Sequence, residues 1–85
     1  MRVWKFAIGD PESPISLPRG AEILSVAVQR GVVCLWALVD PEQPREDRHL
    51  VVAGTGQDVP DERGRFLGTV LLADGDLVFH IWDRA

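Results

Sequence analysis

Histidine and cysteine are the first candidates for chemistry in this 85-residue chain, which contains His49, His80 and a single cysteine, Cys34. General-base catalysis by His80 would need a carboxylate or a nucleophile within hydrogen-bonding reach. On an extended strand, Asp76 lies about 13 Å from His80 along the same face, and Asp83 projects from the opposite face. The sequence therefore assembles no catalytic histidine, and we expect a protein that is not an enzyme.

Metal binding is not indicated either, because no two of the cysteine and histidine residues are closely spaced. Acidic pairs such as Asp58 and Asp61 are more typical of ordinary turns than of a loosely bound cation. Cys34 fits best as a small apolar residue packed next to Trp36. We therefore expect neither a metal nor a cofactor.

The glycine-rich segment Gly54-Thr55-Gly56 follows a predicted strand, and this placement raises the question of a phosphate site. Phosphate loops present several aligned N–H groups, usually at the N-terminus of a helix, and no clear helix is predicted here. A structural turn is the favoured interpretation. In the minority interpretation, Thr55, Gln57 and Asp58 contact a ligand.

The three tryptophans are the best remaining indication of a contact surface. Trp4 is expected in the core. Trp36 and Trp82 fall on the less apolar faces of two predicted hairpins, where an indole ring packs within the chain, anchors a partner or stacks on a ligand. The candidate partner- or ligand-binding set is Trp36, Trp82, His80, Cys34, Thr55, Gln57 and Asp58.

Two predicted β-hairpins position these side chains. Residues 21–39 are rich in Val, Leu and Ile and are interrupted by Arg30-Gly31, whereas residues 66–83 are interrupted by Asp74-Gly75. Asp-Gly between two β-rich runs favours a type I′ turn, in which both central residues have positive φ. Arg30-Gly31 is the weaker signal, because Arg resists positive φ, and a longer turn with a bulge is the alternative there.

Two-residue turns would fix the pairing of the strands, and opposed residues share a face. Each hairpin then has one apolar face and a second face that carries a tryptophan and small polar groups. A shift by one residue would exchange the two faces. The apolar pairs are Val28/Val33, Val26/Leu35 and Leu24/Ala37 in the first hairpin and Leu72/Leu77, Val70/Phe79 and Gly68/Ile81 in the second, with Ile23 and Leu67 on the second faces.

Shorter strands are predicted at residues 3–8, 15–17 and 49–53, with loops at 40–47 and 54–64. The total is six or seven strands, and a single open sheet of them would leave long exposed edges. We therefore expect one all-β domain over residues 1–85. It would be a small barrel, roll or sandwich of mostly antiparallel short strands.

The composition argues against several classes of partner. The apolar share is 46%, the net charge is −4, and acidic residues are spread along the chain. Nucleic acids and anionic membrane surfaces both select for clustered Lys and Arg, so we expect neither as a partner. No apolar run approaches the ~20 residues that cross a bilayer, and the first residues do not read as a signal peptide. A single cysteine forms no intramolecular disulfide, and this favours a reducing intracellular compartment.

Six segments resemble small proteins that are common in tailed bacteriophages and prophages, notably those of actinobacteria. The segments are RVWKF, PRGAEILSV, VVCLWALVDPE, GTGQDVP, FLGTV and DGDLVFHIWD, and together they cover nearly the whole chain. The relatives form a domain of unknown function. They more often carry His after GTG, where this chain has Gln57, so an essential loop histidine is not supported. The resemblance implies an accessory phage protein in the host bacterial cytoplasm, and it implies no activity.

Two interpretations of function follow. The first is a non-enzymatic interaction module, a homo-oligomer that also binds a host protein; the small size and the second apolar faces support it. The alternative is a protein that binds or sequesters a nucleotide-like ligand through two tryptophans, His80 and the 55–58 loop. An enzyme would require a cleft built from His80, Asp83 and Asp58.

Overall fold

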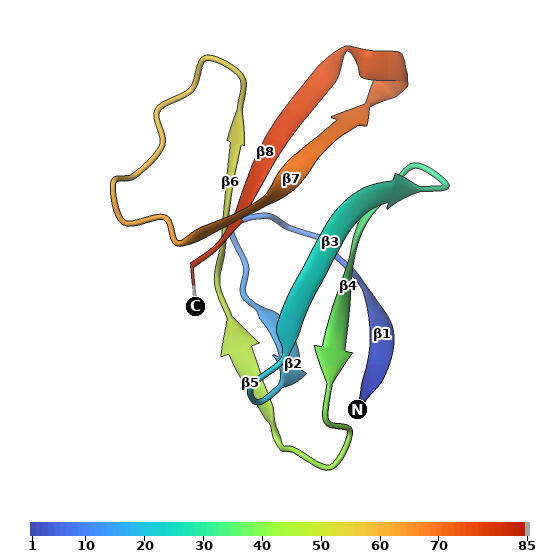
Figure 1. Cartoon of the computed structure of the whole chain (residues 1–85). Coiled ribbons are helices and arrows are strands. Elements are labelled where there is room, and N and C mark those ends of the chain that lie inside the picture. The colour runs from blue at the N-terminus through green and yellow to red at the C-terminus, as the bar shows by residue number, and fades with distance from the viewer. Residues whose placement is uncertain (85) are drawn as a thin grey trace.

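The computed structural model describes residues 1–84 and folds them into eight β-strands in three antiparallel sheets (Figure 1). The all-β prediction is confirmed. No helix within residues 1–84 is long and apolar enough to cross a bilayer. The strands are β1 (Arg2–Ala7), β2 (Ile15–Pro18), β3 (Glu22–Gln29), β4 (Val32–Val39), β5 (Arg45–Arg48), β6 (Leu50–Gly54), β7 (Arg65–Leu72) and β8 (Leu77–Asp83), with a 3₁₀ turn, η1 (Ala73–Gly75), between the last two.

The sheets have the strand orders β1-β4-β3, β2-β5 and β6-β8-β7. Strand β3 lies against β7 where the two three-stranded sheets meet, and the β2-β5 ribbon lies at the opposite end of the molecule from η1 (Figure 1). No barrel closes among these strands. The arrangement is that of a small roll or sandwich, and it agrees with the predicted fold class.

The sealed part of the core lies between the β1-β4-β3 sheet and the β2-β5 ribbon. Trp4 packs against this cluster, as expected, and the Arg45 guanidinium lies 6.0 Å from the centre of its ring. Burial of aliphatic side chains is the main stabilising contribution to a domain of this kind. The side chains with no exposed surface include Leu17, Ile23, Leu35, Ala37 and Val39.

Both predicted turns occur. Arg30 and Gly31 have φ of 52° and 78°, so the first turn has two positive φ values despite its arginine. In the second turn Asp74 and Gly75 have φ of 55° and 92°, and Ala73 before them is also positive, at 51°. The pairs Val28/Val33, Val26/Leu35, Leu72/Leu77, Val70/Phe79 and Gly68/Ile81 are confirmed.

The predicted pairing fails at the far end of the first hairpin, because a β-bulge interrupts β3. Ile23, and not Leu24, lies opposite Ala37. The extra residue reverses the inside–outside pattern of the strand beyond it. As a result Ile23 is completely buried, whereas Leu24 is 43% exposed.

A second bulge at the start of β7 has the same effect. Phe66, and not Leu67, lies opposite Trp82. Leu67 instead packs against the core cluster, and Phe66 is 51% exposed. The bulge sits next to Gly68, a strand glycine of the kind that often marks such an irregularity.

The strand count is eight because part of the predicted 40–47 loop is a strand. Only residues 40–44 form the loop, in which the Asp40 carboxylate accepts a hydrogen bond from the N–H of Glu42 at 3.1 Å. The charged segment Arg45–Arg48 pairs with Ile15–Pro18 as β5 and β2. This prediction was wrong because four charged or polar residues carry no alternating apolar signal.

A buried ion pair holds β5 in place. Arg48 Nη1 lies 3.0 Å from Asp83 Oδ2, and Arg48 Nη2 donates a hydrogen bond to the carbonyl of Ala21 at 2.7 Å. These contacts tie β5 to the end of β8 and to the start of β3. The pair was not predicted, although an aspartate on the apolar side of β8 signals a buried partner.

Candidate functional site

The outer face of the β6-β8-β7 sheet carries two of the predicted site residues, His80 and Trp82, and we call it the histidine face. Strand β8 is central, so its outward side chains have neighbours on both sides. Thr69 and Ala53 flank His80 in register, and Phe66 and Val51 flank Trp82. The histidine face consists of Val51, Ala53, Phe66, Thr69, Leu71, Val78, His80 and Trp82.

His80 is held between two threonines. Its Nε2 lies 2.8 Å from Oγ1 of Thr55, and its Nδ1 lies 2.9 Å from Oγ1 of Thr69. In a neutral imidazole one nitrogen donates and the other accepts, and a hydroxyl can serve either. Both nitrogens are therefore occupied, and the ring is fixed on the sheet. Thr69 lies directly opposite His80 on the neighbouring strand, whereas Thr55 comes from the turn that follows β6.

An aromatic pair lies beside the histidine. The rings of Phe66 and Trp82 are 5.3 Å apart in an edge-to-face arrangement, and His80 lies 6.5 Å from Trp82. Phe66 is 51% and Leu71 56% exposed, while Trp82 is half-buried. Neither Phe66 nor Leu71 was among the predicted site residues. A glycine inside a strand often marks a bulge, so Gly68 was the one sequence feature that could have predicted the outward position of Phe66.

The glycine-rich segment forms a self-contained turn. The Gln57 side chain accepts a hydrogen bond from the N–H of Gly54 at 2.7 Å, and the Gln57 N–H donates to the Gly54 carbonyl at 3.1 Å. Gly56 has φ of 89°, which glycine adopts without strain. Gln57 is thus engaged within the turn, and Asp58 follows it as an exposed residue. From this turn, only the Thr55 side chain bonds to the His80 ring.

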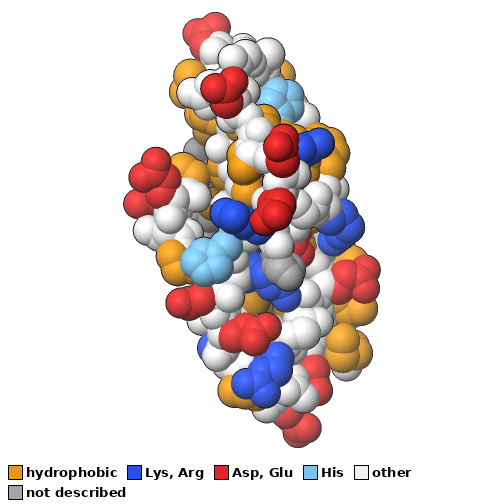
Figure 2. Space-filling model, turned by 90° about the vertical axis from the view of Figure 1, so that its left-hand side faces the viewer, with side chains coloured by type: hydrophobic (Ala, Val, Ile, Leu, Met, Phe, Trp, Pro, Cys, Tyr) orange, Lys and Arg blue, Asp and Glu red, His pale blue; other side chains and the backbone are white. Residues whose placement is uncertain are grey.

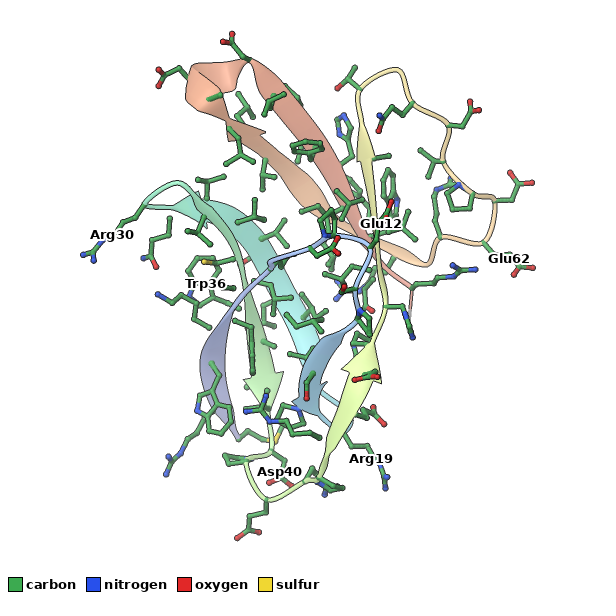
Figure 3. All side chains as sticks on the ribbon, turned by 180° about the vertical axis from the view of Figure 1, so that it is seen from behind. Glu12, Arg19, Arg30, Trp36, Asp40 and Glu62 are labelled. Carbon is green, nitrogen blue, oxygen red and sulfur yellow. The ribbon has the colours of Figure 1, made fainter. Side chains whose placement is uncertain are left out.

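Trp36 and Cys34 lie on a different surface, the outer face of the β1-β4-β3 sheet. Trp36 is half-buried and points away from the sandwich (Figure 3). Cys34 is only 3% exposed, as expected of an apolar filler. On the same face, Lys5 Nζ donates a hydrogen bond to Gln29 Oε1 at 2.7 Å, spanning β4 from β1 to β3. Because its side chain is buried, Cys34 offers no contact surface.

The predicted set consequently divides in two. His80, Trp82 and Thr55 come together, and Gln57 and Asp58 follow Thr55 in its turn. Trp36 belongs to the other sheet, and within residues 1–84 no ring contact or hydrogen bond joins it to the His80 group. A single site that uses both tryptophans does not form within one chain.

Charge is mixed over the surface. Figure 2 shows acidic and basic side chains interspersed with apolar ones, without a continuous basic patch on the visible face. Within the described part of the chain, no three His, Cys, Asp or Glu side chains are grouped so that they could hold a metal ion.

Comparison with known proteins gives one match. The sequence model of a protein family described as a domain of unknown function, DUF7352, matches residues 1–85. No curated protein and no solved structure matches the chain.

Proposed function

The chain belongs to that family of unknown function, and we propose that it is a non-enzymatic module that binds a protein through the histidine face. The observation that carries the proposal is the exposed apolar row on a sheet face. Phe66 and Leu71 are each more than half exposed, and the Phe66 ring packs edge-to-face against Trp82. Exposed apolar patches of this kind are typical of partner surfaces, and aromatic side chains are frequent anchors.

The polar centre of the histidine face suits a protein contact. His80 already has both ring nitrogens hydrogen-bonded to Thr55 and Thr69. Covering a satisfied group avoids the penalty of leaving a donor or acceptor without a partner. A partner with a flat apolar patch would therefore bury this face without having to supply matching polar groups.

The face also suits a second copy of the chain. Two copies of one apolar face are self-complementary in a twofold dimer, and an 85-residue domain gains stability from association. Our proposal accordingly includes a homo-oligomer that also binds a host protein.

The resemblance to small proteins of tailed phages supports a phage or prophage origin and action in the host bacterial cytoplasm. Cys34 is buried and unpaired with another cysteine, as suits a reducing compartment. Both statements are part of the proposal.

The geometry supports a protein partner better than the nucleotide-like alternative. Trp36 lies on the other sheet, and the glycine-rich turn directs Gln57 to its own backbone. A thermal-shift screen with linear and cyclic nucleotides tests this ranking. Saturable stabilisation by any nucleotide would favour the alternative.

The decisive experiment compares native mass and partner capture in two variants. Phe66→Ser combined with Leu71→Ser removes the apolar row at two exposed positions, so we expect the fold to persist. Val32→Ser is the control, because Val32 is 46% exposed on the other sheet. The double variant should become monomeric and lose at least tenfold in partner capture from host lysate, and the control should match the wild type. A wild-type monomer whose captured proteins are the same for all three chains would refute the proposal.

A further inference from the structure

The two three-stranded sheets separate toward the end that carries η1. Near the β2-β5 ribbon, the inward-facing Leu35 and Ile23 are completely buried. Toward the other end, Val33, Val52 and Phe79 also face inward but are only half-buried. Inward-facing apolar side chains that remain accessible indicate space between the sheets.

This space is an apolar pocket of about 190 Å³. It is lined from both sheets by Val33, Val52, Val70, Leu72, Phe79 and Ile81. No charged or hydroxyl-bearing side chain contributes to its lining. Apolar cavities of about 150 Å³ stay free of water and take up molecules the size of benzene. A pocket of this size and chemistry suits a hydrocarbon group of about six to eight carbon atoms.

The segment that follows β1 borders the pocket on one side. Ile8, Gly9 and Pro11 line the pocket, and they also line an adjoining hollow of about 280 Å³. Figure 3 shows this segment, which carries Glu12, passing between the two sheets. A ligand that leaves the pocket here enters a polar surrounding.

Acidic groups mark that polar surrounding. The Asp10 side chain lines the hollow, and its carboxylate accepts hydrogen bonds from the N–H of Glu12 at 2.9 Å and from Oγ of Ser13 at 3.1 Å. Glu12 is exposed on the same loop, and no basic side chain lines the hollow. Like charges repel at short range, so a carboxylate headgroup is disfavoured at this position.

We propose that this pocket binds the hydrocarbon part of a small amphiphile whose headgroup is neutral or positively charged. The ligand's hydrocarbon part would lie between the two sheets, and its headgroup would lie beside Asp10. The site is separate from the histidine face, because its side chains point toward the interior of the sandwich. It therefore holds whether or not the proposed protein partner exists.

Titration with n-alkylamines of four to ten carbons, followed by methyl and aromatic NMR, tests the proposal on the intact chain. The signals of Val52, Phe79 and Ile81 should shift saturably. Affinity should rise about fourfold for each added methylene and level off near eight carbons. Hexanol should bind comparably to hexylamine, and hexanoate at least fivefold more weakly.

Paired substitutions on β4 locate the site. Val33→Phe adds bulk inside the pocket and should weaken hexylamine binding at least tenfold. Val32→Phe, on the outward side of the same strand, should leave binding unchanged. Val52→Phe is the second test, should Val33→Phe fail to fold. An absence of saturable shifts in the wild type, or equal binding by a folded pocket variant, would overturn the site; equal binding of hexanoate would overturn the headgroup preference.

Discussion

Arg48 and Asp83 form a buried ion pair across 3.0 Å, with both side chains only 9% exposed. The two residues come from β5 and β8, so the pair links the β2-β5 ribbon to the sheet that carries the histidine face. Arg48 also donates to the carbonyl of Ala21. The pair thus fixes three segments that are distant in sequence.

Replacing Arg48 by methionine keeps most of the side-chain length but leaves the Asp83 carboxylate buried without its guanidinium. Loss of one partner of a buried pair is costly, so we expect the free energy of unfolding to fall by about 3 kcal/mol. Urea denaturation measures this change. Arg19→Met is the control, because the Arg19–Glu46 pair is exposed and 3.6 Å long, and such pairs contribute about 0–1 kcal/mol. Equal effects in the two variants would contradict the assigned role.

Thr69→Val removes the hydroxyl that bonds to Nδ1 of His80 at nearly constant shape. We expect a loss of about 1 kcal/mol in unfolding free energy and a shift of the His80 ring-nitrogen resonances. Thr69→Ser retains the hydroxyl and should retain both properties. Unchanged nitrogen resonances in the valine variant would show that this hydrogen bond does not form in solution.

Gly64 and Gly20 both have positive φ, of 81° and 79°, but their surroundings differ. A Cβ on Gly64 would meet the backbone of Asp83 and Arg84, whereas a Cβ on Gly20 would meet nothing within 4 Å. Gly20→Ala should therefore lower the unfolding free energy only by the conformational term, about 1–2 kcal/mol. Gly64→Ala should lower it by clearly more, because backbone atoms must move. Equal melting temperatures for the two variants would be incompatible with the close approach.

Cys34 should react slowly with thiol reagents in the folded protein, since it is 3% exposed and buried thiols are inert. Ellman's reagent should label it at once in concentrated guanidinium chloride. In buffer, labelling should follow the rate of unfolding. Immediate stoichiometric labelling of the native chain would contradict the burial of this side chain.

Local turn chemistry made most of the two large hairpins predictable. Arg30-Gly31 and Asp74-Gly75 set the strand pairing, and therefore the outward position of His80 and Trp82. The sequence pattern does not reveal where a bulge reverses the phase, because that depends on which side chain the core accommodates. For this reason the pattern did not predict that Ile23, and not Leu24, is buried in the core.

The remaining differences come from contacts between distant segments. Strand β5 forms because Arg48 pairs with Asp83 and because its backbone pairs with β2. Neither contact can be predicted from the local sequence REDR. The hydrogen bond between Thr55 and His80 likewise depends on how the chain returns after β6. Contacts of this kind can be predicted only when the order of the strands in the sheets is known, and the pattern of each strand does not give that order.

The bulge beside Gly68 separates the exposed aromatic pair from the packing of the core. Removing Leu67 would make Phe66 and Gly68 direct neighbours, restore a regular ladder and keep Phe66 opposite Trp82 on the outer face. The Phe66–Trp82 ring pair would be retained, whereas the core cluster would lose the Leu67 side chain that packs against it. A one-codon deletion at this position would therefore weaken the interior while sparing the aromatic surface.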